Sequence, residues 1–249
     1  MFALYKKELH GFFLSPVAYI VIAFFMMTFS LTFIMDIANA SSSLYEFSFP
    51  TIFYVNLMYF VFTIPLLTMR SFAEERKNGT EILLLSSPVS VTKIVLAKFF
   101  ATATVLLIMI GCSLMYPLLT AMMGKVVLSH LLCTYIGFFL FGMVCASLGI
   151  LISSFTESPL LAIIISEAAM LLLILMDSVS QTALFSSIPV VSDILSWFSN
   201  LGKFNAFSQG LIRLSDLVGY LTEILLFLIW TVISVEKRRW SRRKQSWEN

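Results

Sequence analysis

A short charged segment between two apolar stretches carries the most chemical information in this sequence. Arg70, Glu74, Glu75 and Arg76 fall close together, and an Asn-Gly-Thr sequence lies just beyond them. The charged residues favour a helix, and Gly79 can supply the left-handed conformation that often closes a helix C-terminus. The pattern therefore predicts a short, rigid, charged helix, which is suited to act as a lever.

The rest of the same segment predicts a second short helix. Thr80 is placed to cap it, residues 82–85 are apolar, and Pro88 stops it. Ser90 is then placed to cap the next long apolar stretch. We expect residues 70–90 to form a helix–turn–helix along the membrane surface, with the charged half facing water and the apolar half facing lipid or protein.

Two acidic residues lie inside otherwise apolar stretches. Glu167 comes ten residues after Glu157, about 15 Å along a helix, which places it near the middle of a bilayer. Glu223 lies nearer one end of the last apolar stretch. A charge at the bilayer centre costs on the order of a few kcal/mol, so it usually faces a cavity or a partner. We expect these glutamates to line a translocation path or a dimer seam; the alternative is a protonated side chain hydrogen-bonded between helices.

The remaining reactive residue types do not form a catalytic or metal-binding set. Cys112, Cys133 and Cys145 all lie in apolar runs, and His10 and His130 are far apart in the sequence. Structural or catalytic zinc needs three or four clustered ligands. The sequence also lacks a nucleotide-binding loop, a G-x-S-x-G elbow and an H-E-x-x-H motif. We therefore expect no enzyme activity in this chain and no cofactor bound by it.

The composition identifies the environment in which these residues must work. The chain has 249 residues, of which 59% are apolar and 12% charged, whereas soluble domains have roughly 45–50% and 25%. The mean hydropathy is +0.94. A soluble single-core protein could not bury this much apolar surface, so we expect a chain embedded in the lipid bilayer. The same numbers exclude a disordered chain, a secreted disulfide scaffold and a nucleic-acid binder.

Six stretches are long and apolar enough to cross a bilayer, which takes about 20 residues. They cover residues 16–35, 51–69, 91–123, 127–153, 159–176 and 217–235. The predicted fold class is therefore an all-α polytopic membrane protein, with residues 1–249 forming a single transmembrane domain. Residues 70–90 are the loop between the second and third spans.

Basic residues predict the orientation of these spans, because they collect on the cytoplasmic side of membrane proteins. If both termini are cytoplasmic, 13 of the 16 lysines and arginines fall on that side, with Lys98 reaching it from the base of the third span. Only Lys125, Lys203 and Arg213 fall outside. We therefore expect both termini, and the loop at residues 70–90, to be cytoplasmic.

The two ends of the chain are predicted to lie at the membrane surface. In residues 1–15 apolar side chains recur every three or four positions, which predicts an interfacial helix. A signal peptide cleaved near residues 38–40 is the less favoured alternative, because the apolar run is too long and Asp36 lies between it and the possible cleavage site. In residues 236–249 six basic residues and two tryptophans follow the last span. They suit a headgroup anchor, and the alternative is a contact with a partner protein.

Residues 177–216, between the fifth and sixth spans, are too long for a structureless loop. They contain apolar runs at residues 194–198 and 206–214, so we expect short helices on the outer face. A simple amphipathic cover over the helix ends is the plainest interpretation.

Two segments resemble a known family. The sequence M-R-S-F-A-E-E-R-K-N-G-T-E-I-L-L-L-S-S-P-V-S is very similar to the cytoplasmic loop of type-2 ABC exporter permeases, in the small six-helix branch of the gliding-motility and sodium/antibiotic-exporter type. A second, weaker similarity covers residues 204–216, just before the last span. The resemblance extends over the whole chain in length and in its six-helix plan.

The resemblance implies the membrane subunit of an ATP-driven exporter in the bacterial cytoplasmic membrane. Such a permease pairs with a second copy or a sister permease and binds two ATPase subunits, which hold ATP and Mg²⁺. The implied ATPase-coupling residues are Arg70, Glu74, Glu75, Arg76, Gly79 and Thr80. The implied outer gate contains Phe204, Phe207, Gly210 and Asp216.

The sequence alone leaves a second function open. A proton-coupled secondary transporter or channel would use Glu167 and Glu223, and the loop at residues 70–90 would then only fix the topology. The transported substrate is not indicated by any residue pattern.

Overall fold

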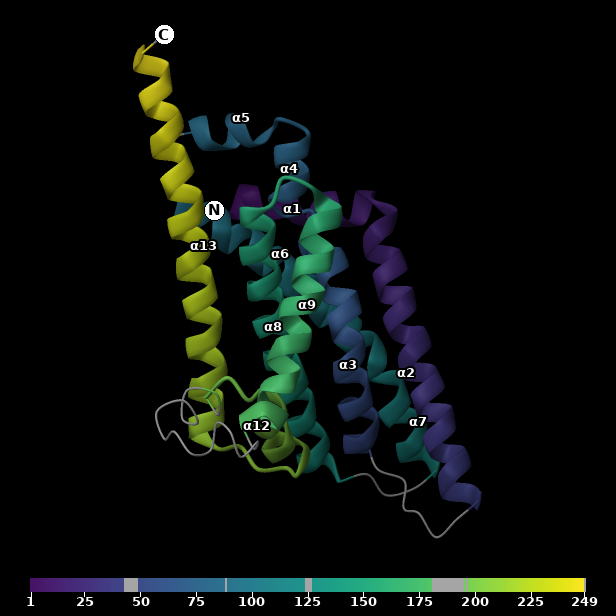
Figure 1. The fold of residues 1–249 in the computed structure, drawn as a ribbon. Coiled ribbons are helices and arrows are strands. Elements are labelled where there is room, and N and C mark those ends of the chain that lie inside the picture. Colours follow the sequence, from purple (N-terminus) through teal and green to yellow (C-terminus); the bar gives the residue numbers. More distant parts are fainter. Residues whose placement is uncertain (43–48, 88, 124–126, 181–194, 196, 249) are drawn as a thin grey trace.

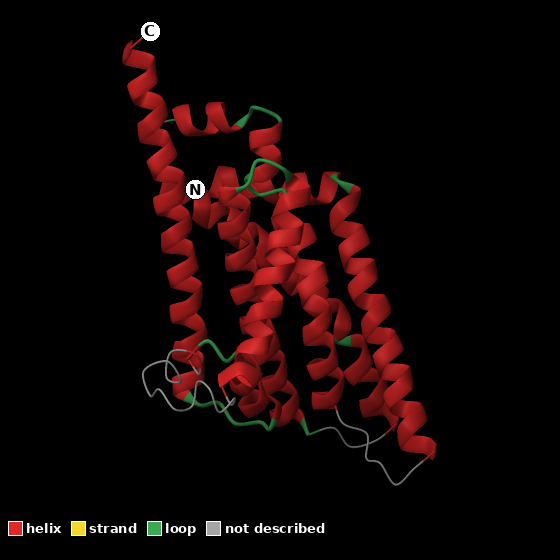
Figure 2. Cartoon of the chain, viewed as in Figure 1, coloured by secondary structure: helices red, strands yellow, loops and turns green. Residues whose placement is uncertain are grey.

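The computed structural model describes residues 1–42, 49–87, 89–123, 127–180, 195 and 197–248. Within these residues the chain is helical and contains no strand (Figure 2). The helices are α1 (Phe2–Leu14), α2 (Pro16–Ser42), α3 (Phe49–Thr68), α4 (Ala73–Lys77), α5 (Glu81–Ser86), α6 (Val91–Ser113), α7 (Met115–Met123), α8 (Leu128–Phe155), α9 (Pro159–Ser180), α12 (Asn200–Ser208) and α13 (Leu214–Glu248).

Six helical segments are long and apolar enough to cross a membrane, as predicted. They are Pro16–Asn39, Phe49–Lys77, Val91–Met122, Leu128–Phe155, Pro159–Met176 and Leu214–Trp240. Figure 1 shows them side by side, with α4, α5, α1 and both chain termini at one end of the bundle and α7 and α12 at the other. We call these the α4–α5 end and the α12 end. The predicted all-α fold with six spans is confirmed.

Helix α8 is the centre of the bundle and packs against α3, α6, α9, α12 and α13. Its glycines allow this close packing, since Gly137 lies against Phe207 and Gly142 lies against Phe60. Around them is a cluster of aromatic rings; the rings of Phe60 and Phe138 are 4.3 Å apart and those of Phe53 and Phe138 are 5.1 Å apart. Aromatic packing and small residues thus hold the bundle together where burial in lipid provides little driving force.

The third span, predicted at residues 91–123, consists of two helices in succession. Helix α6 ends at Ser113, and α7 begins again at Met115. Pro117 has no N–H group to donate to the Ser113 carbonyl one turn earlier, which weakens the helix at this point. Pro65 lies inside α3 without such a break, so the proline alone does not determine where the helix is interrupted.

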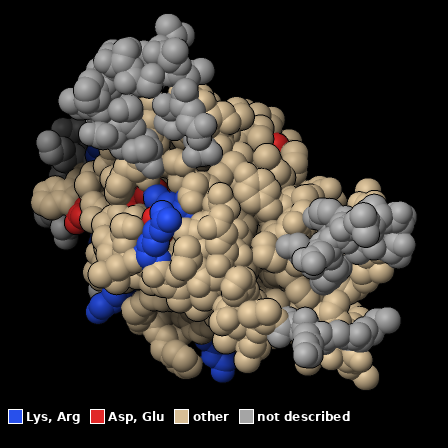
Figure 3. Space-filling model, turned by 90° about the horizontal axis from the view of Figure 1, so that it is seen from below, with Lys and Arg blue, Asp and Glu red and all other residues tan. Residues whose placement is uncertain are grey.

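The N-terminal segment forms a helix, as its amphipathic pattern predicted, and the basic C-terminal segment is also helical, which was not predicted. Helix α1 runs across the α4–α5 end, packing on α6 and α2, and Ser15 in extended conformation separates it from α2. Helix α13 continues beyond the bundle at this same end without a break (Figure 1). The opposite end, seen from below in Figure 3, is mostly uncharged over its described atoms, with only scattered charged side chains.

Candidate functional site

Helix α4 is closed at its C-terminus by Gly79, as predicted. Gly79 has a φ angle of +72°, and its N–H donates to the Arg76 carbonyl at 3.0 Å. The N–H of Thr80 donates to the Glu75 carbonyl at 2.9 Å. These two hydrogen bonds form a Schellman motif, which satisfies carbonyls that a helix end would otherwise leave free. The turn between α4 and α5 is therefore well defined.

Thr80 and Ser90 occupy the N-cap positions of α5 and α6, as predicted, but neither hydroxyl makes a capping hydrogen bond. The Thr80 hydroxyl donates back to the Glu75 carbonyl at 3.2 Å and makes no cap bond to α5. Thr80 has helical backbone angles, whereas a capping residue is usually extended, so its side chain points toward the helix behind it. Ser90 is extended and its carbonyl accepts the Lys93 N–H at 3.0 Å, but its hydroxyl makes no cap bond to α6.

Arg76 ties α4 to the end of α8. Its guanidinium donates to the Ser154 carbonyl at 2.8 Å and to the Thr156 carbonyl at 3.0 Å, and it forms an ion pair with Glu81 at 3.3 Å. The last carbonyls of a helix lack intrahelical partners, and an arginine can supply donors to several of them at once. This contact fixes the loop on the central helix of the bundle.

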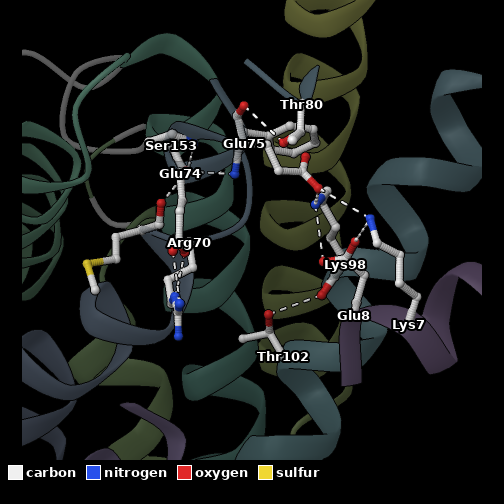
Figure 4. Close-up of polar contacts among 12 residues, drawn as sticks. Lys7, Glu8, Arg70, Glu74, Glu75, Thr80, Lys98, Thr102 and Ser153 are labelled. Carbon is white, nitrogen blue, oxygen red and sulfur yellow. Dashed lines mark hydrogen bonds and ion pairs between the residues drawn. The ribbon is translucent and has the colours of Figure 1, made fainter. Parts of the chain in front are cut away.

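Lys98 of α6 joins α4 to α1 (Figure 4). Its ammonium lies 2.9 Å from the Glu75 carboxylate and 3.2 Å from the Glu8 carboxylate. Lys98 extends toward the α4–α5 end, as predicted, but it does not reach water there, because the residue is only 2% exposed. Two carboxylates from different helices supply its charge partners inside the protein, which removes the need to reach water.

Arg70 and Ser153 hold the segment that leads into α4. The Arg70 guanidinium makes a two-pronged contact with Glu74, with one distance of 2.9 Å, and also donates to the Ser15 hydroxyl. The Ser153 hydroxyl accepts the N–H groups of Phe72 and Ala73 at 3.1 and 3.0 Å (Figure 4). Nothing in the sequence distinguished Ser153 from other serines at span ends.

The charged half of this loop is bound to the protein, contrary to the prediction that it faces water. Glu81 is 2% exposed, and Arg76 and Glu75 are engaged as described above. The exposed part is the tip, formed by residues 77–80, together with Ile82 and Leu83, whose exposed fractions are 55% and 73%. A rigidly held loop thus presents a partly apolar surface at the α4–α5 end.

Glu167 lies on α9 and is partly exposed, next to the buried Ser166. The described part of the chain gives its carboxylate no hydrogen bond or ion pair. Its neighbours Ile164 and Ile165 are exposed side chains, so this face of α9 is not covered within one chain. The position is compatible with a path or a seam, and a role for Glu167 stays a prediction.

Glu223 lies at the α12 end and is fully buried. Its carboxylate accepts a hydrogen bond from the Lys203 ammonium, which also lies over the rings of Trp197 and Tyr220 at 5.5 and 5.4 Å. The Tyr220 hydroxyl donates to the Asn200 carbonyl at 2.9 Å. This cluster connects α12 to α13. Sequence analysis found Glu223 but placed Lys203 only as an outer-side charge.

The residues proposed for an outer gate lie in and after α12. Phe204 and Phe207 are fully buried, and the α12 helix packs on α8 and α9. Gly210 has a φ angle of +76° and lies against His130, while Asp216 is in the first turn of α13. Much of the predicted outer segment, at residues 181–194 and 196, lies outside the described residues.

Residues 36–235 match the family described as ABC-2 family transporter protein. The chain belongs to the ABC-2 transporter family. The match includes the loop between the second and third spans, Glu167, Glu223 and the α12 segment. No curated protein matches the chain.

Membership of the ABC-2 family bears on the expectation that the chain is not an enzyme. An ABC-2 permease is the membrane component of a transporter and is not itself an enzyme, and this family generally works with an ABC ATPase. Within the described residues no cluster of three or more His, Cys, Asp or Glu side chains is placed to hold a metal ion. Helix α1 and residues 236–249 of this ABC-2 permease lie outside the matched range.

Proposed function

We propose that this ABC-2 permease is the membrane subunit of an ATP-driven exporter and that its α4–α5 loop receives the ATPase. The observation that carries the proposal is the combination of a fixed loop and an exposed tip. Glu75 fastens the loop to α6, and Arg76 and Ser153 fasten it to α8, while Ile82 and Leu83 remain uncovered. A partner that pushes on such a tip would move the helices behind it.

The loop has the rigidity that a lever needs. The Schellman turn at Gly79 fixes the angle between α4 and α5, and the Arg76 contacts fix α4 on α8. Lys98 links the same helix to α1 and α6. A force applied at the tip therefore reaches α1, α6 and α8 through buried, charge-assisted contacts, which are stronger than neutral hydrogen bonds.

The proposed assembly contains two permease chains and two ATPase subunits. ATP and Mg²⁺ belong to the ATPase subunits, and the second permease is another copy or a sister chain. The distribution of basic residues supports an orientation with both termini and the α4–α5 end in the cytoplasm of a bacterial cell. The α12 end then faces outward, where Phe204, Phe207, Gly210 and Asp216 would form part of an outer gate.

A proton-coupled transporter built on Glu167 and Glu223 has less support. Glu223 is enclosed and paired with Lys203, and no contact within the described residues joins it to Glu167. Under the exporter proposal Glu167, on the uncovered face of α9, lines the substrate path or the seam between two permeases.

Copurification from mild detergent tests the proposal. The permease is coexpressed with a candidate ABC ATPase, and the double variant Ile82→Ser/Leu83→Ser is compared with Leu211→Ser/Ile212→Ser. Both pairs are exposed, at opposite ends of the bundle. We expect the first variant to lose the ATPase and the second to retain it. Equal ATPase recovery with both variants would contradict docking at the loop tip.

A further inference from the structure

Two arginines at the start of the basic tail bind the loop that the exporter proposal assigns to the ATPase. Arg238 lies 3.6 Å from the Glu81 carboxylate. Arg239 donates to the Ser87 carbonyl at 3.1 Å and to the Val89 carbonyl at 3.2 Å. Both arginines are on α13, immediately beyond the apolar part of the last span. The tail therefore makes specific contacts with α5 and with the residues that follow it.

The two arginines hold opposite ends of α5. Glu81 is the first residue of this helix, and Ser87 is its C-cap. Six helical residues span roughly 9 Å, a distance that two neighbouring arginine side chains on α13 can cover. The Arg239 contacts are of the kind that stabilise helix C-termini, where carbonyls lack intrahelical partners. One turn of α13 thus fixes both ends of α5.

The burial of Glu81 indicates that its contact with Arg238, at the first residue of α5, helps to hold the folded loop in place. Its side chain is almost entirely enclosed between Arg76 and Arg238. A buried carboxylate is costly unless cations and hydrogen bonds compensate it, so removal of one arginine takes away part of that compensation. Arg239 requires the forked geometry of a guanidinium to reach two carbonyls, and a lysine cannot reproduce this contact.

Neither of the two sequence-based interpretations of the tail includes these contacts. A headgroup anchor would leave the arginines free for lipid, and a docking surface would leave them free for the ATPase. Lys237 and Trp240 are indeed exposed, but Arg238 and Arg239 are partly buried against the loop. Both arginines lie beyond residues 36–235, the range that matches the family.

We propose that Arg238 and Arg239 are positioning residues that clamp the α4–α5 loop to α13, so that the loop and the last span move as one unit. The role in movement rests on the proposed function of the loop; the clamp itself rests on the contacts alone. Some 15 residues earlier, roughly 22 Å along α13, Glu223 and Tyr220 bind Lys203 and Asn200 of α12. Helix α13 therefore connects the loop to the α12 end.

Hydrogen exchange on the purified full-length permease tests the clamp. The double variant Arg238→Gln/Arg239→Gln is compared with wild type and with Lys237→Gln, which removes a neighbouring exposed charge. We expect α5 amides to exchange at least about tenfold faster in the double variant, because two carbonyl contacts and one ion pair are lost. Exchange in α8 of the double variant, and in α5 of the Lys237→Gln protein, should match wild type. The exchange rate of α5 in Arg239→Lys should lie between those of wild type and the double variant. Unchanged protection of α5 in the double variant would overturn the clamp.

A second measurement tests movement in the complete permease–ATPase complex. The native Cys112, Cys133 and Cys145 are first replaced. A single cysteine is then introduced at the exposed position Arg213, and its rate of labelling by a water-soluble thiol reagent reports on the conformation of the α12 end. In wild type and in Lys237→Gln we expect the labelling rate to change when ATP and vanadate trap the ATPase. In Arg238→Gln/Arg239→Gln the ATPase should still bind and hydrolyse ATP, while the change at position 213 falls at least about threefold.

The outcomes separate the two proposals. A full nucleotide-dependent change in the double variant, with a loosened α5, would overturn the role of the clamp in movement. Loss of the ATPase from the wild-type complex, or no nucleotide-dependent change in wild type, would overturn the proposed function and with it the movement. The exchange measurement would still decide whether Arg238 and Arg239 hold α5.

Discussion

Close packing at Gly137 determines how α12 sits on the central helix. A Cβ atom at this position would lie 2.6 Å from the Cβ and 2.8 Å from the Cγ of Phe207. We therefore expect Gly137→Ala to destabilise the permease by about 1–3 kcal/mol, because α12 must shift to relieve the overlap. Thermal unfolding in detergent measures this. The matched control is Gly111→Ala, where nothing lies within 4 Å of the added atom; a melting temperature lowered equally by both changes would refute the packing argument.

The buried ion pair at the α12 end makes a different prediction. Removal of one partner leaves an uncompensated buried charge, which typically costs about 3–5 kcal/mol, whereas removal of both charges is often nearly neutral. Lys203→Met should therefore destabilise strongly, and Lys203→Met/Glu223→Leu should recover most of the loss. A double-mutant cycle on thermal stability provides the measurement. Additive effects of the two single changes would show that Lys203 and Glu223 do not depend on each other.

At the scale of single residues, the sequence identified most charged positions but not their partners. Glu74, Glu75 and Glu223 were recognised from their types and surroundings. The contacts of Glu75 with Lys98 and of Glu223 with Lys203 join different helices, whereas Arg70 is only one helical turn from Glu74. The burial of Lys98 was not predicted, because its partners lie on α1 and α4 and no local pattern connects them.

Within the α4–α5 loop the two adjacent glutamates should differ in importance. Glu74 is paired with Arg70 in a half-exposed contact, and such pairs typically contribute at most about 1 kcal/mol. Glu75 is paired with the buried Lys98, which loses its nearest charge partner if Glu75 changes. Coupling is measured as the nucleotide-dependent change in the labelling rate at position 213. We expect Glu75→Gln to reduce this change several-fold more than Glu74→Gln does. Equal effects, or a larger effect of Glu74→Gln, would contradict the proposed linkage through Lys98.

At the scale of elements, the sequence predicted which helices exist better than how they begin and end. The apolar stretches gave all six spans, and Gly79 gave the end of α4, because a left-handed turn at a glycine is a local property. Thr80 and Ser90 are at the predicted N-cap positions, but their sequence did not show that their hydroxyls would make no capping hydrogen bond. The clamp by Arg239 was not predictable either, since it joins residues about 150 positions apart.

For the whole molecule, Glu167 marks a face of the bundle that one chain leaves uncovered. If this face lines a path or a seam that admits water, a cysteine replacing Glu167 should react with a small water-soluble thiol reagent once the native cysteines are replaced. A cysteine at the exposed Ile164, one turn earlier on α9, serves as the comparison. Protection of position 167 in every nucleotide state, together with normal ATPase coupling in Glu167→Leu, would leave the residue with only a packing role.

The central claim is that the ATPase docks at the exposed tip of the α4–α5 loop. A photo-reactive amino acid at Leu83 tests this directly in cells that express the permease and its ATPase. The same amino acid at Leu214, which is equally exposed at the opposite end of the bundle, is the control. Irradiation should join the permease covalently to the ATPase from position 83 and not from position 214. The absence of an ATPase adduct at position 83, or an adduct from position 214, would contradict the account.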